Sequence, residues 1–265
     1  MIYLLPKWNK LKKDLKNRPV YIFLDYDGTL TPISKSPDKA LMPQRARELL
    51  ATLSKRPGYK LAIISGRALK DIKNLVGVPG IVYVGNHGLE IEGPKLKFGS
   101  IVPPGFKNVL KKIRNDLNKK LISIEGAFLE DKGYTLSLHY RLAKEKDIPL
   151  IKTAFHEAII AYLVGNKVKI NSGKMTLEIR PPIEWDKGKA VLWLLARQEF
   201  ISKDDNVLSI YIGDDVTDED AFGALENKGL TIFVGYSKES KARYCLKSPQ
   251  EVEEFLGRIA ELERA

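Results

Sequence analysis

The fold of this chain is decided by one stretch, Val20-Tyr-Ile-Phe-Leu-Asp-Tyr-Asp-Gly-Thr-Leu30. The residues before Asp25 form a short apolar run, which is typical of a strand covered on both faces of a sheet. The run stops at two carboxylates, Asp25 and Asp27, that are followed by a glycine. Later apolar runs stop in a similar way, at Ser65-Gly66-Arg67, at Gly85-Asn86-His87-Gly88 and at Gly213-Asp214-Asp215.

Helical patterns separate these apolar runs. We expect strands at 20–24, 61–64, 81–84, 207–212 and 230–234, and helices at 43–54, 68–76, 188–200, 218–225 and 249–263. This alternation predicts an α/β fold with a Rossmann-like parallel sheet core and helices on both faces. Because the chemistry of such sheets gathers beyond the carboxyl ends of the strands, the polar stops form one candidate site.

The middle of the chain follows a different pattern. It contains helical stretches at 106–119 and 148–164 and strand-like stretches at 123–130, 134–141, 167–171 and 175–180. Residues 134–141 alternate between apolar and polar, which indicates an antiparallel sheet with one open face. We therefore predict an inserted α+β cap over 101–182 and a core formed by 1–100 and 183–265. Pro103-Pro104-Gly105 and Pro181-Pro182 are the expected hinges.

Composition narrows the class of protein. The longest apolar runs, 158–164 and 190–196, are far shorter than the roughly 20 residues that cross a bilayer, so no membrane association is expected. A single cysteine, Cys245, favours a reducing, cytoplasmic location. The 44 Lys and Arg against 33 Asp and Glu give a formal charge of +11. That surplus is compatible with nucleic acid, with an anionic substrate or with a solvated surface, but no nucleic-acid-binding motif is visible and we expect no such partner.

The carboxylates at the strand ends suggest a metal site. Asp25 and Asp27 would repel each other in a buried crevice unless a cation lies beside them, and Asp214 supplies a third carboxylate. Mg²⁺ is the usual cation where phosphate is the substrate. The alternative at this point is that Asp27-Gly28 and Asp214-Asp215 are only turn formers.

Together these residues carry a family resemblance. Asp25-x-Asp27-Gly28-Thr29, Ser65, Lys187-Gly188 and Gly213-Asp214-Asp215-x-x-Asp218 resemble, in order, the four motifs of the haloacid dehalogenase-like phosphatases. More narrowly, these segments with Gly85-Asn86-His87-Gly88 and the cap stretches 130–141 and 173–181 resemble the trehalose-6-phosphate phosphatases. The resemblance covers most of the chain beyond its first twenty residues.

The resemblance implies roles for the core residues. Asp25 is the expected nucleophile, and Asp27 the expected general acid and base. Ser65 and Lys187 would hold the phosphoryl oxygens; Lys189 is a competing candidate, although Lys187 precedes the glycine as in the family motif. The expected Mg²⁺ ligands are Asp25, Asp214 and, through its backbone carbonyl, Asp27. The residues expected to support them are Thr29, Asp215 and Asp218.

The cap is expected to select the sugar. Lys174 and Glu178 share one predicted strand face and match positions that bind sugar hydroxyls in the resembled family. The other expected substrate contacts are Glu130, Lys132, His139 and Arg141 in the cap and Arg67, Asn86 and His87 in the core. For Arg141 and Arg180 an interstrand ion pair is the competing interpretation.

The resulting expectation is a Mg²⁺-dependent phosphatase that converts trehalose 6-phosphate to trehalose and inorganic phosphate through an aspartyl phosphate. It would act as a monomer on a small sugar phosphate, with a trehalose-phosphate synthase as a possible partner. The nearest alternative is a phosphatase of another glycosyl phosphate, such as sucrose phosphate, glucosylglycerol phosphate or mannosylglycerate phosphate. A non-catalytic sugar-phosphate sensor and a nucleic-acid-binding protein are the alternatives from other classes.

Overall fold

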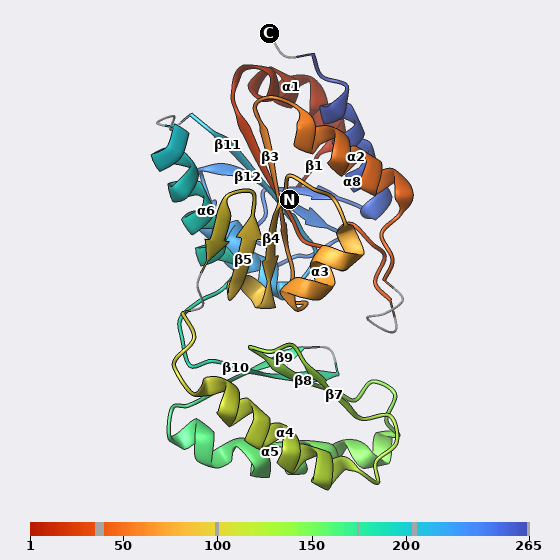
Figure 1. Ribbon diagram of the computed structural model, residues 1–265. Helices are drawn as coiled ribbons and strands as arrows, with labels where there is room; N and C mark the ends of the chain where they lie inside the picture. Colours follow the sequence, from red (N-terminus) through yellow and green to blue (C-terminus); the bar gives the residue numbers. More distant parts are fainter. Residues whose placement is uncertain (35–39, 99–100, 174, 203–205, 264–265) are drawn as a thin grey trace. The chain divides into compact units, whose positions relative to one another are not determined.

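The computed structural model describes residues 1–34, 40–98, 101–173, 175–202 and 206–263. The chain divides into two compact units (Figure 1). Unit 1 comprises Met1–Gly99 and Trp185–Ala265, and unit 2 comprises Ser100–Glu184. Among the described residues, no helix has both the length and the apolar content that crossing a bilayer requires.

Unit 1 is built on a nine-stranded sheet with the order β1-β13-β12-β11-β2-β3-β4-β5-β6. The pairs from β1 across to β4 are parallel, whereas β4–β5 and β5–β6 are antiparallel. The strands are β1 (Ile2–Tyr3), β2 (Val20–Leu24), β3 (Tyr59–Ile64), β4 (Val82–Gly85), β5 (Glu90–Gly93), β6 (Leu96–Phe98), β11 (Leu208–Gly213), β12 (Gly229–Val234) and β13 (Tyr244–Leu246).

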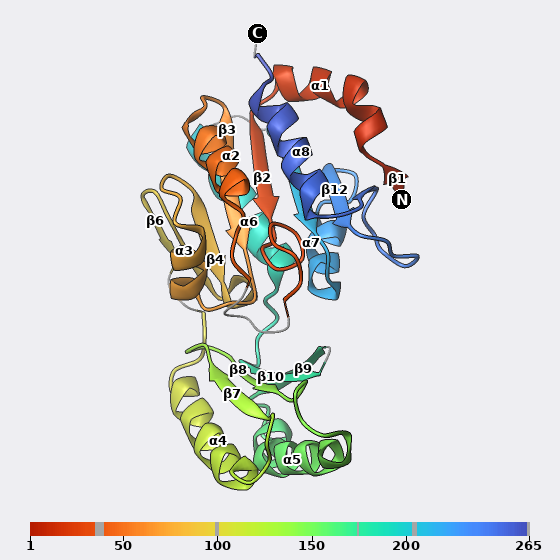
Figure 2. The same cartoon turned by 90° about the vertical axis from the view of Figure 1, so that its right-hand side faces the viewer.

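Helices cover both faces of this sheet (Figures 1 and 2). The side chains of β2 explain why, because Ile22 and Leu24 enter one buried cluster while Tyr21 and Phe23 enter the other. The first cluster includes residues from α1 (Trp8–Asn17), α2 (Gln44–Lys55), α3 (Leu69–Val76) and α8 (Pro249–Ala260). The second includes residues from α6 (Lys187–Ser202) and α7 (Glu219–Ala224). Short 3₁₀ turns lie at η1 (Leu5–Lys7), η3 (Asn86–Gly88) and η5 (Val216–Asp218).

This arrangement confirms the predicted core fold and adds elements that the sequence pattern did not reveal. The strands β1 and β13 are too short to show a period. The hairpin β5–β6 makes one edge of the sheet antiparallel, and its turn places Lys95 at φ 55°. These additions extend the two edges and leave the predicted central strands in place.

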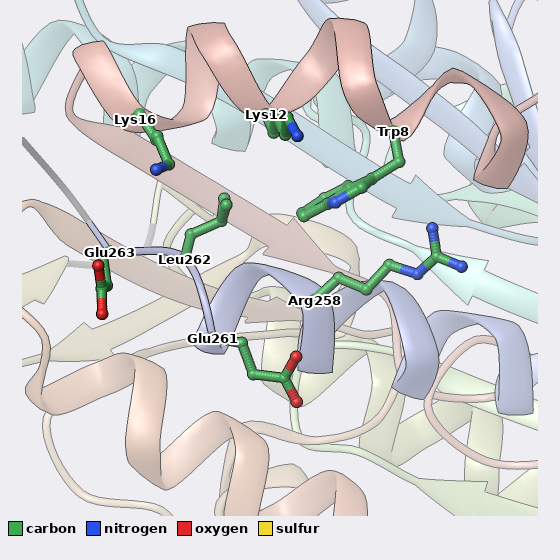
Figure 3. Close-up of a pocket in the computed structure, with 7 residues that line it drawn as sticks. All are labelled: Trp8, Lys12, Lys16, Arg258, Glu261, Leu262 and Glu263. Atoms are coloured by element: carbon green, nitrogen blue, oxygen red, sulfur yellow. The ribbon is translucent and has the colours of Figure 1, made fainter.

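The N-terminal helix α1 packs on the body of unit 1. Leu11 and Leu15 are buried, and the Trp8 ring meets Phe255 edge-on at 6.1 Å between centroids. Beside this contact lies a hollow of about 340 Å³ between α1 and the end of α8 (Figure 3). Trp8 therefore has a packing role.

Unit 2 is an antiparallel sheet with helices on one face, as predicted for the cap. Its strands, in the order β7-β8-β10-β9, are β7 (Phe128–Asp131), β8 (Leu136–His139), β10 (Thr176–Arg180) and β9 (Lys169–Gly173). The helices α4 (Phe106–Leu121) and α5 (Ile148–Val164) pack on the face that carries Leu136, Leu138 and Ile179, and η4 (Glu145–Asp147) precedes α5.

The chain leaves unit 1 after β6 and returns to it before α6, and one aromatic contact joins these two places. Phe98 at the end of β6 stacks on Trp185, with 5.6 Å between ring centroids and 14° between planes. The Trp185 indole N–H also donates to the carbonyl oxygen of Gly88 at 2.8 Å. This contact fixes the outgoing and returning segments to the core.

Candidate active site

Two neighbouring strands bring the first carboxylates together. β2 and β11 are paired in parallel, with Leu24 opposite Ile212, and the next residue, Asp25, donates its backbone N–H to the carbonyl oxygen of Ile212 at 2.9 Å. β11 ends at Gly213, so Asp214 follows at the same edge of the sheet. The topology therefore places residues that are far apart in sequence at one carboxyl edge.

Lys187, the first residue of α6, joins Asp25 to a further carboxylate, that of Asp218. Its Nζ lies 2.7 Å from Asp25 Oδ1 and 2.8 Å from Asp218 Oδ1. The exposed fractions of the three side chains are 3% for Lys187, 7% for Asp25 and 0% for Asp218. The competing candidate, Lys189, is 43% exposed and pairs with Asp186 at 3.5 Å. Lys187 is thus the lysine that lies among the buried carboxylates.

Asp218 is surrounded by hydrogen-bond donors. Its Oδ1 accepts from Lys187 and from the Tyr211 hydroxyl at 2.7 Å, and its Oδ2 accepts from the backbone N–H groups of Asp214 and Asp215, each at 3.0 Å. A carboxylate has about four lone-pair sites, and these donors fill them. Asp218 therefore holds Lys187 and the loop after β11 in place.

Two glycines allow the loops to approach this closely. A Cβ on Gly28, which has a φ of 91°, would lie 2.0 Å from the Asp214 carboxylate, and a Cβ on Gly213 would lie 2.3 Å from Asp218 Cγ. Thr29 donates its hydroxyl to Asp214 Oδ1 at 3.2 Å. The Asp-Gly turn thus brings the loop after β2 against Asp214.

Burial and mutual repulsion shape the charges of the cluster. Burial, reinforced by Asp218 and Asp214, raises the pKa of Asp25 well above its usual 3.8 despite Lys187. Burial and the charge of Asp218 raise the pKa of Asp214 to about 7. Burial alone would lower the pKa of Lys187, but Asp218 and Asp25 outweigh it and raise this pKa. When all three carboxylates are ionised, they carry more negative charge than the one Lys187 ammonium balances.

A divalent cation fits this charge imbalance. Asp25, Asp214 and Asp218 each offer an oxygen, and these oxygens lie within 4.8 Å of one another. Hard cations such as Mg²⁺ prefer oxygen ligands and lower the repulsion between neighbouring carboxylates. Because the donors around Asp218 occupy its lone pairs, Asp25 and Asp214 are the members best able to bind a cation.

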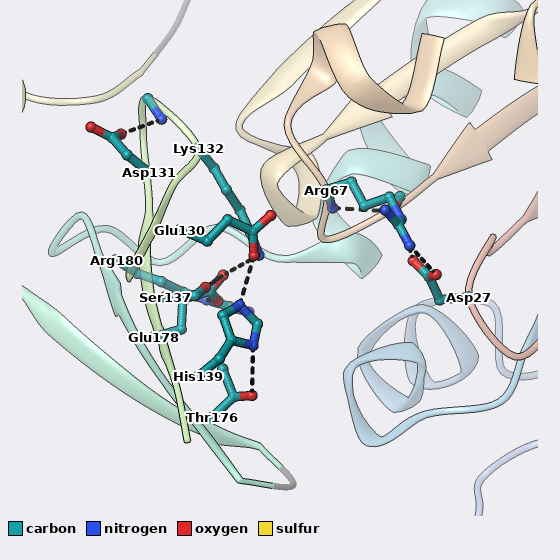
Figure 4. A network of polar contacts seen from close by, with 12 residues as sticks. Asp27, Arg67, Glu130, Asp131, Lys132, Ser137, His139, Thr176, Glu178 and Arg180 are labelled. Carbon is teal, nitrogen blue, oxygen red and sulfur yellow. Dashed lines mark hydrogen bonds and ion pairs between the residues drawn. The ribbon is translucent and has the colours of Figure 1, made fainter. Parts of the chain in front are cut away.

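Asp27 has a different partner. Its carboxylate forms a bidentate ion pair with Arg67, with Nε–Oδ2 and Nη2–Oδ1 distances of 2.7 and 2.6 Å (Figure 4). The Asp27 side chain is 43% exposed and that of Arg67 13% exposed. The Arg67 guanidinium also lies over the Tyr26 ring, 5.4 Å from its centroid. Arg67, expected as a substrate contact, thus holds the expected acid and base.

The Asn-His-Gly turn supports the loop that carries Ser65. The backbone N–H of His87 donates to the Ser65 carbonyl at 3.0 Å, and that of Asn86 donates to the Arg67 carbonyl at 2.8 Å. The His87 ring covers Gly66, where a Cβ would lie 2.4 Å from Nε2. Asn86 is buried and donates its side-chain amide to Glu90. The backbone N–H groups of Asn86 and His87 therefore contact this loop, whereas the Asn86 side chain contacts β5.

In unit 2, strand register sorts the polar face into rows. His139 pairs with Phe128 and Thr176, and Ser137 pairs with Glu130 and Glu178. Glu178 is 6% exposed, yet it faces Lys132 Nζ at 3.3 Å, Arg180 Nε at 2.5 Å and the Ser137 hydroxyl at 3.3 Å (Figure 4). The buried carboxylate therefore joins two cations on one sheet face.

The remaining cap candidates lie on or near this face. Both ring nitrogens of His139 have partners, Glu130 at 2.7 Å and the Thr176 hydroxyl at 3.3 Å. Arg141 is exposed, and Arg180 pairs with Glu178 on its own strand rather than across strands. Lys174 lies outside the described residues.

Sequence reasoning did not find the role of Tyr211. This tyrosine lies in the interior of β11, is fully buried, and has a pKa raised well above 10.0 by burial and by Asp218. A tyrosine in an apolar strand indicates core packing, so its hydrogen bond to Asp218 had no signal beyond the hydroxyl itself.

Comparisons with known proteins agree on one family. Residues 23–250 match the family described as trehalose-phosphatase. The chain is 38% identical over 269 residues to a probable trehalose-phosphate phosphatase D of Arabidopsis thaliana, covering 97% of this chain and 71% of that relative. It is 35% identical over 272 residues to a trehalose 6-phosphate phosphatase of Zea mays, covering 97% and 74%. A solved C-terminal domain of the C. albicans trehalose-6-phosphate phosphatase superposes with a TM-score of 0.81 at 26% identity, over 99% of this chain and 98% of that one.

Proposed function

Because the chain belongs to the trehalose-phosphatase family, we propose that it hydrolyses trehalose 6-phosphate to trehalose and inorganic phosphate. The membership agrees with the resemblance of its motifs. The observation that carries the chemistry is the buried group in which Lys187 joins Asp25 to Asp218 beside Asp214. A candidate nucleophile, the Lys187 ammonium and further carboxylates in one buried cluster suit phosphoryl transfer better than binding without reaction.

Mg²⁺ is the proposed cofactor, and the residues proposed to hold it are Asp25, Asp214 and the backbone carbonyl of Asp27. When bound, the ion would neutralise charge on the phosphoryl oxygens and between the carboxylates. The oxygen-only donor set and the raised pKa of Asp214 support this assignment.

In the proposed first half-reaction, an Asp25 carboxylate oxygen attacks phosphorus while the bond from phosphorus to the sugar oxygen breaks. Asp27, in its protonated form, gives its proton to that sugar oxygen, so trehalose leaves neutral and Asp25 carries the phosphoryl group. Lys187 has a third N–H beyond those directed to Asp25 and Asp218, and this third N–H is proposed to donate to a phosphoryl oxygen. Ser65 Oγ accepts the backbone N–H of Arg67 at 3.1 Å, which leaves its own proton to donate to a phosphoryl oxygen.

In the proposed second half-reaction, a water oxygen attacks the same phosphorus. Asp27, now a carboxylate, takes a proton from the water, and the bond between phosphorus and Asp25 breaks to release phosphate. Arg67 holds the Asp27 carboxylate in position for this step, since it pairs with both oxygens. Both side chains of the nucleophile and acid then return to their starting protonation states.

Unit 2 is proposed to select the sugar through its polar sheet face. Glu178 supports this role, because a carboxylate fixed by Lys132, Arg180 and Ser137 is rigid and offers oriented oxygen to hydroxyl donors. Glu130 and Lys132 lie nearby on the same face, 3.8 Å apart. Contacts by Lys174 and Arg141 remain part of the proposal.

Phosphate release from a panel of sugar phosphates tests the function. Trehalose 6-phosphate is expected to be hydrolysed with the highest kcat/KM, and only with Mg²⁺ present. Better turnover of sucrose phosphate, glucosylglycerol phosphate or mannosylglycerate phosphate would replace the substrate and keep the chemistry. Asp25→Asn is expected to be folded and inactive, so measurable turnover by that variant would contradict the assigned nucleophile.

Sugar selection has its own test. Glu178→Ala is expected to lower kcat/KM for trehalose 6-phosphate far more than for p-nitrophenyl phosphate, which has no sugar. Glu157→Ala, an exposed glutamate on α5 of the same unit, is the matched control. An equal loss on both substrates would mean that Glu178 has a structural role.

We further propose a cytoplasmic monomer. The single cysteine supports a reducing compartment, and light scattering of the purified chain tests the monomer. Co-purification with a trehalose-phosphate synthase tests the proposed partner.

A further inference from the structure

We propose that Tyr211 is a positioning residue, which acts on Lys187 through Asp218. The proposal rests on the function above and deepens it, because it extends the phosphate-binding machinery by a buried hydroxyl that never touches the substrate. The residues form a chain of contacts from Tyr211 through Asp218 and Lys187 to Asp25, with distances of 2.7, 2.8 and 2.7 Å.

The Tyr211 ring is held firmly. It lies in the middle of β11, between strands β2 and β12, and is 0% exposed. Phe222 of α7 meets it edge-on at 5.6 Å and 88°. Because the ring cannot move without disturbing this packing, its hydroxyl is a fixed donor.

That donor shares one oxygen with Lys187. Asp218 Oδ1 accepts from the Tyr211 hydroxyl and from Lys187 Nζ, whereas Oδ2 is occupied by two backbone N–H groups. Without the hydroxyl, a fully buried carboxylate oxygen would have Lys187 as its remaining donor. A buried acceptor left with fewer donors is destabilised, and we expect a closer contact with its remaining donor to offset part of that cost. Lys187 would then shift toward Asp218 and away from Asp25.

The neighbouring strand provides a matched control. Tyr21 of β2 belongs to the same buried cluster, is 3% exposed and stacks on Phe23 at 4.3 Å. In the part of the chain that the structure describes, its hydroxyl has no side-chain hydrogen bond to the active-site carboxylates. Tyr21→Phe therefore removes an equivalent atom from the same core without touching Asp218.

The experiment compares Tyr211→Phe with Tyr21→Phe, with p-nitrophenyl phosphate as substrate so that an error in the assigned sugar does not affect the outcome. Tyr211→Phe is expected to lower kcat by roughly tenfold to a hundredfold, the range for one hydrogen bond to a charged group, with little change in KM. Tyr21→Phe is expected to stay within about twofold of wild type. In an Asp218→Asn background, the further effect of Tyr211→Phe is expected to fall below about twofold, because the two act through one path.

A second measurement does not depend on turnover. The side-chain ammonium resonance of Lys187, recorded by ¹H–¹⁵N NMR on metal-free protein, is expected to shift in Tyr211→Phe and to stay unchanged in Tyr21→Phe. An unmoved resonance, or a kcat loss that is the same for both variants, would overturn the proposal. If the wild-type protein shows no phosphatase activity but the Lys187 resonance shifts in Tyr211→Phe, only the proposed function is overturned.

Discussion

Replacing Asp214 by Asn is expected to make the metal-free protein more stable at pH 8. Asp214 is half-buried, and burial together with Asp218 raises its pKa from 3.8 to about 7. A carboxyl whose pKa is raised on folding stabilises the native state below its unfolded pKa, and this contribution is lost as the pH rises through the folded value. Ionised Asp214 thus opposes folding at pH 8.

The size of the effect follows from the two pKa values. The interval from 3.8 to about 7 corresponds to up to about 4 kcal/mol, at roughly 1.36 kcal/mol per pH unit. About 3 kcal/mol of this destabilisation of the native state develops as the pH rises from 5 to 8. Asn keeps an oxygen for the Thr29 hydroxyl but carries no charge. The free energy of unfolding of Asp214→Asn should therefore exceed that of wild type at pH 8 and approach it at pH 5.

Urea denaturation in EDTA, followed by fluorescence at both pH values, measures these differences. Asp14→Asn, which removes an exposed carboxylate from α1, is the control and should behave as wild type. Mg²⁺ at a hundred times its Kd should stabilise wild type by about 2.7 kcal/mol and Asp214→Asn by much less. The reasoning is refuted if Asp214→Asn is less stable than wild type at pH 8, or if Mg²⁺ stabilises both proteins equally.

Further substitutions probe the surrounding contacts. Lys187→Met should lower the free energy of unfolding by about 3–5 kcal/mol at neutral pH, because it leaves two buried carboxylates without their cation, and thermal denaturation should show partial recovery in acid. Gly188→Ala would place a Cβ 2.3 Å from the carbonyl oxygen of Asp220, so a loss of about 1–3 kcal/mol in urea is expected; an unchanged midpoint would contradict this close approach. Arg67→Gln should change stability by less than about 1 kcal/mol, since Asp27 is partly exposed, yet lower kcat by about tenfold or more. An unchanged kcat would mean that Arg67 does not position Asp27.

Elements with a clear period were predictable. The alternation of apolar and polar residues in β8 predicted the buried Leu136 and Leu138, and the apolar run 20–24 predicted a central strand. The proximity of the candidate residues at the ends of β2 and β11 followed from the parallel pairing of these two strands.

Details that depend on side-chain partners were not predictable. Spacing alone placed Asp25 and Asp27 as a pair, yet Asp27 bonds to Arg67 while Asp25 bonds to Lys187. Asp218 was expected to play a supporting part, but only the folded structure shows that it accepts four hydrogen bonds. Which side chain pairs with each carboxylate depends on the distances between loops, and a local sequence pattern does not contain these distances.

The stack of Phe98 on Trp185 has a consequence for how such a protein can arise. The two rings lie 5.6 Å apart at the points where the chain leaves and re-enters unit 1, so the ends of the intervening segment already meet. To the nine-stranded sheet, residues 100–184 are an insertion between β6 and α6, and lengthening such a connection adds little closure entropy. Evolution could therefore exchange the entire inserted module for another while the ancestral scaffold and its acidic cluster persist.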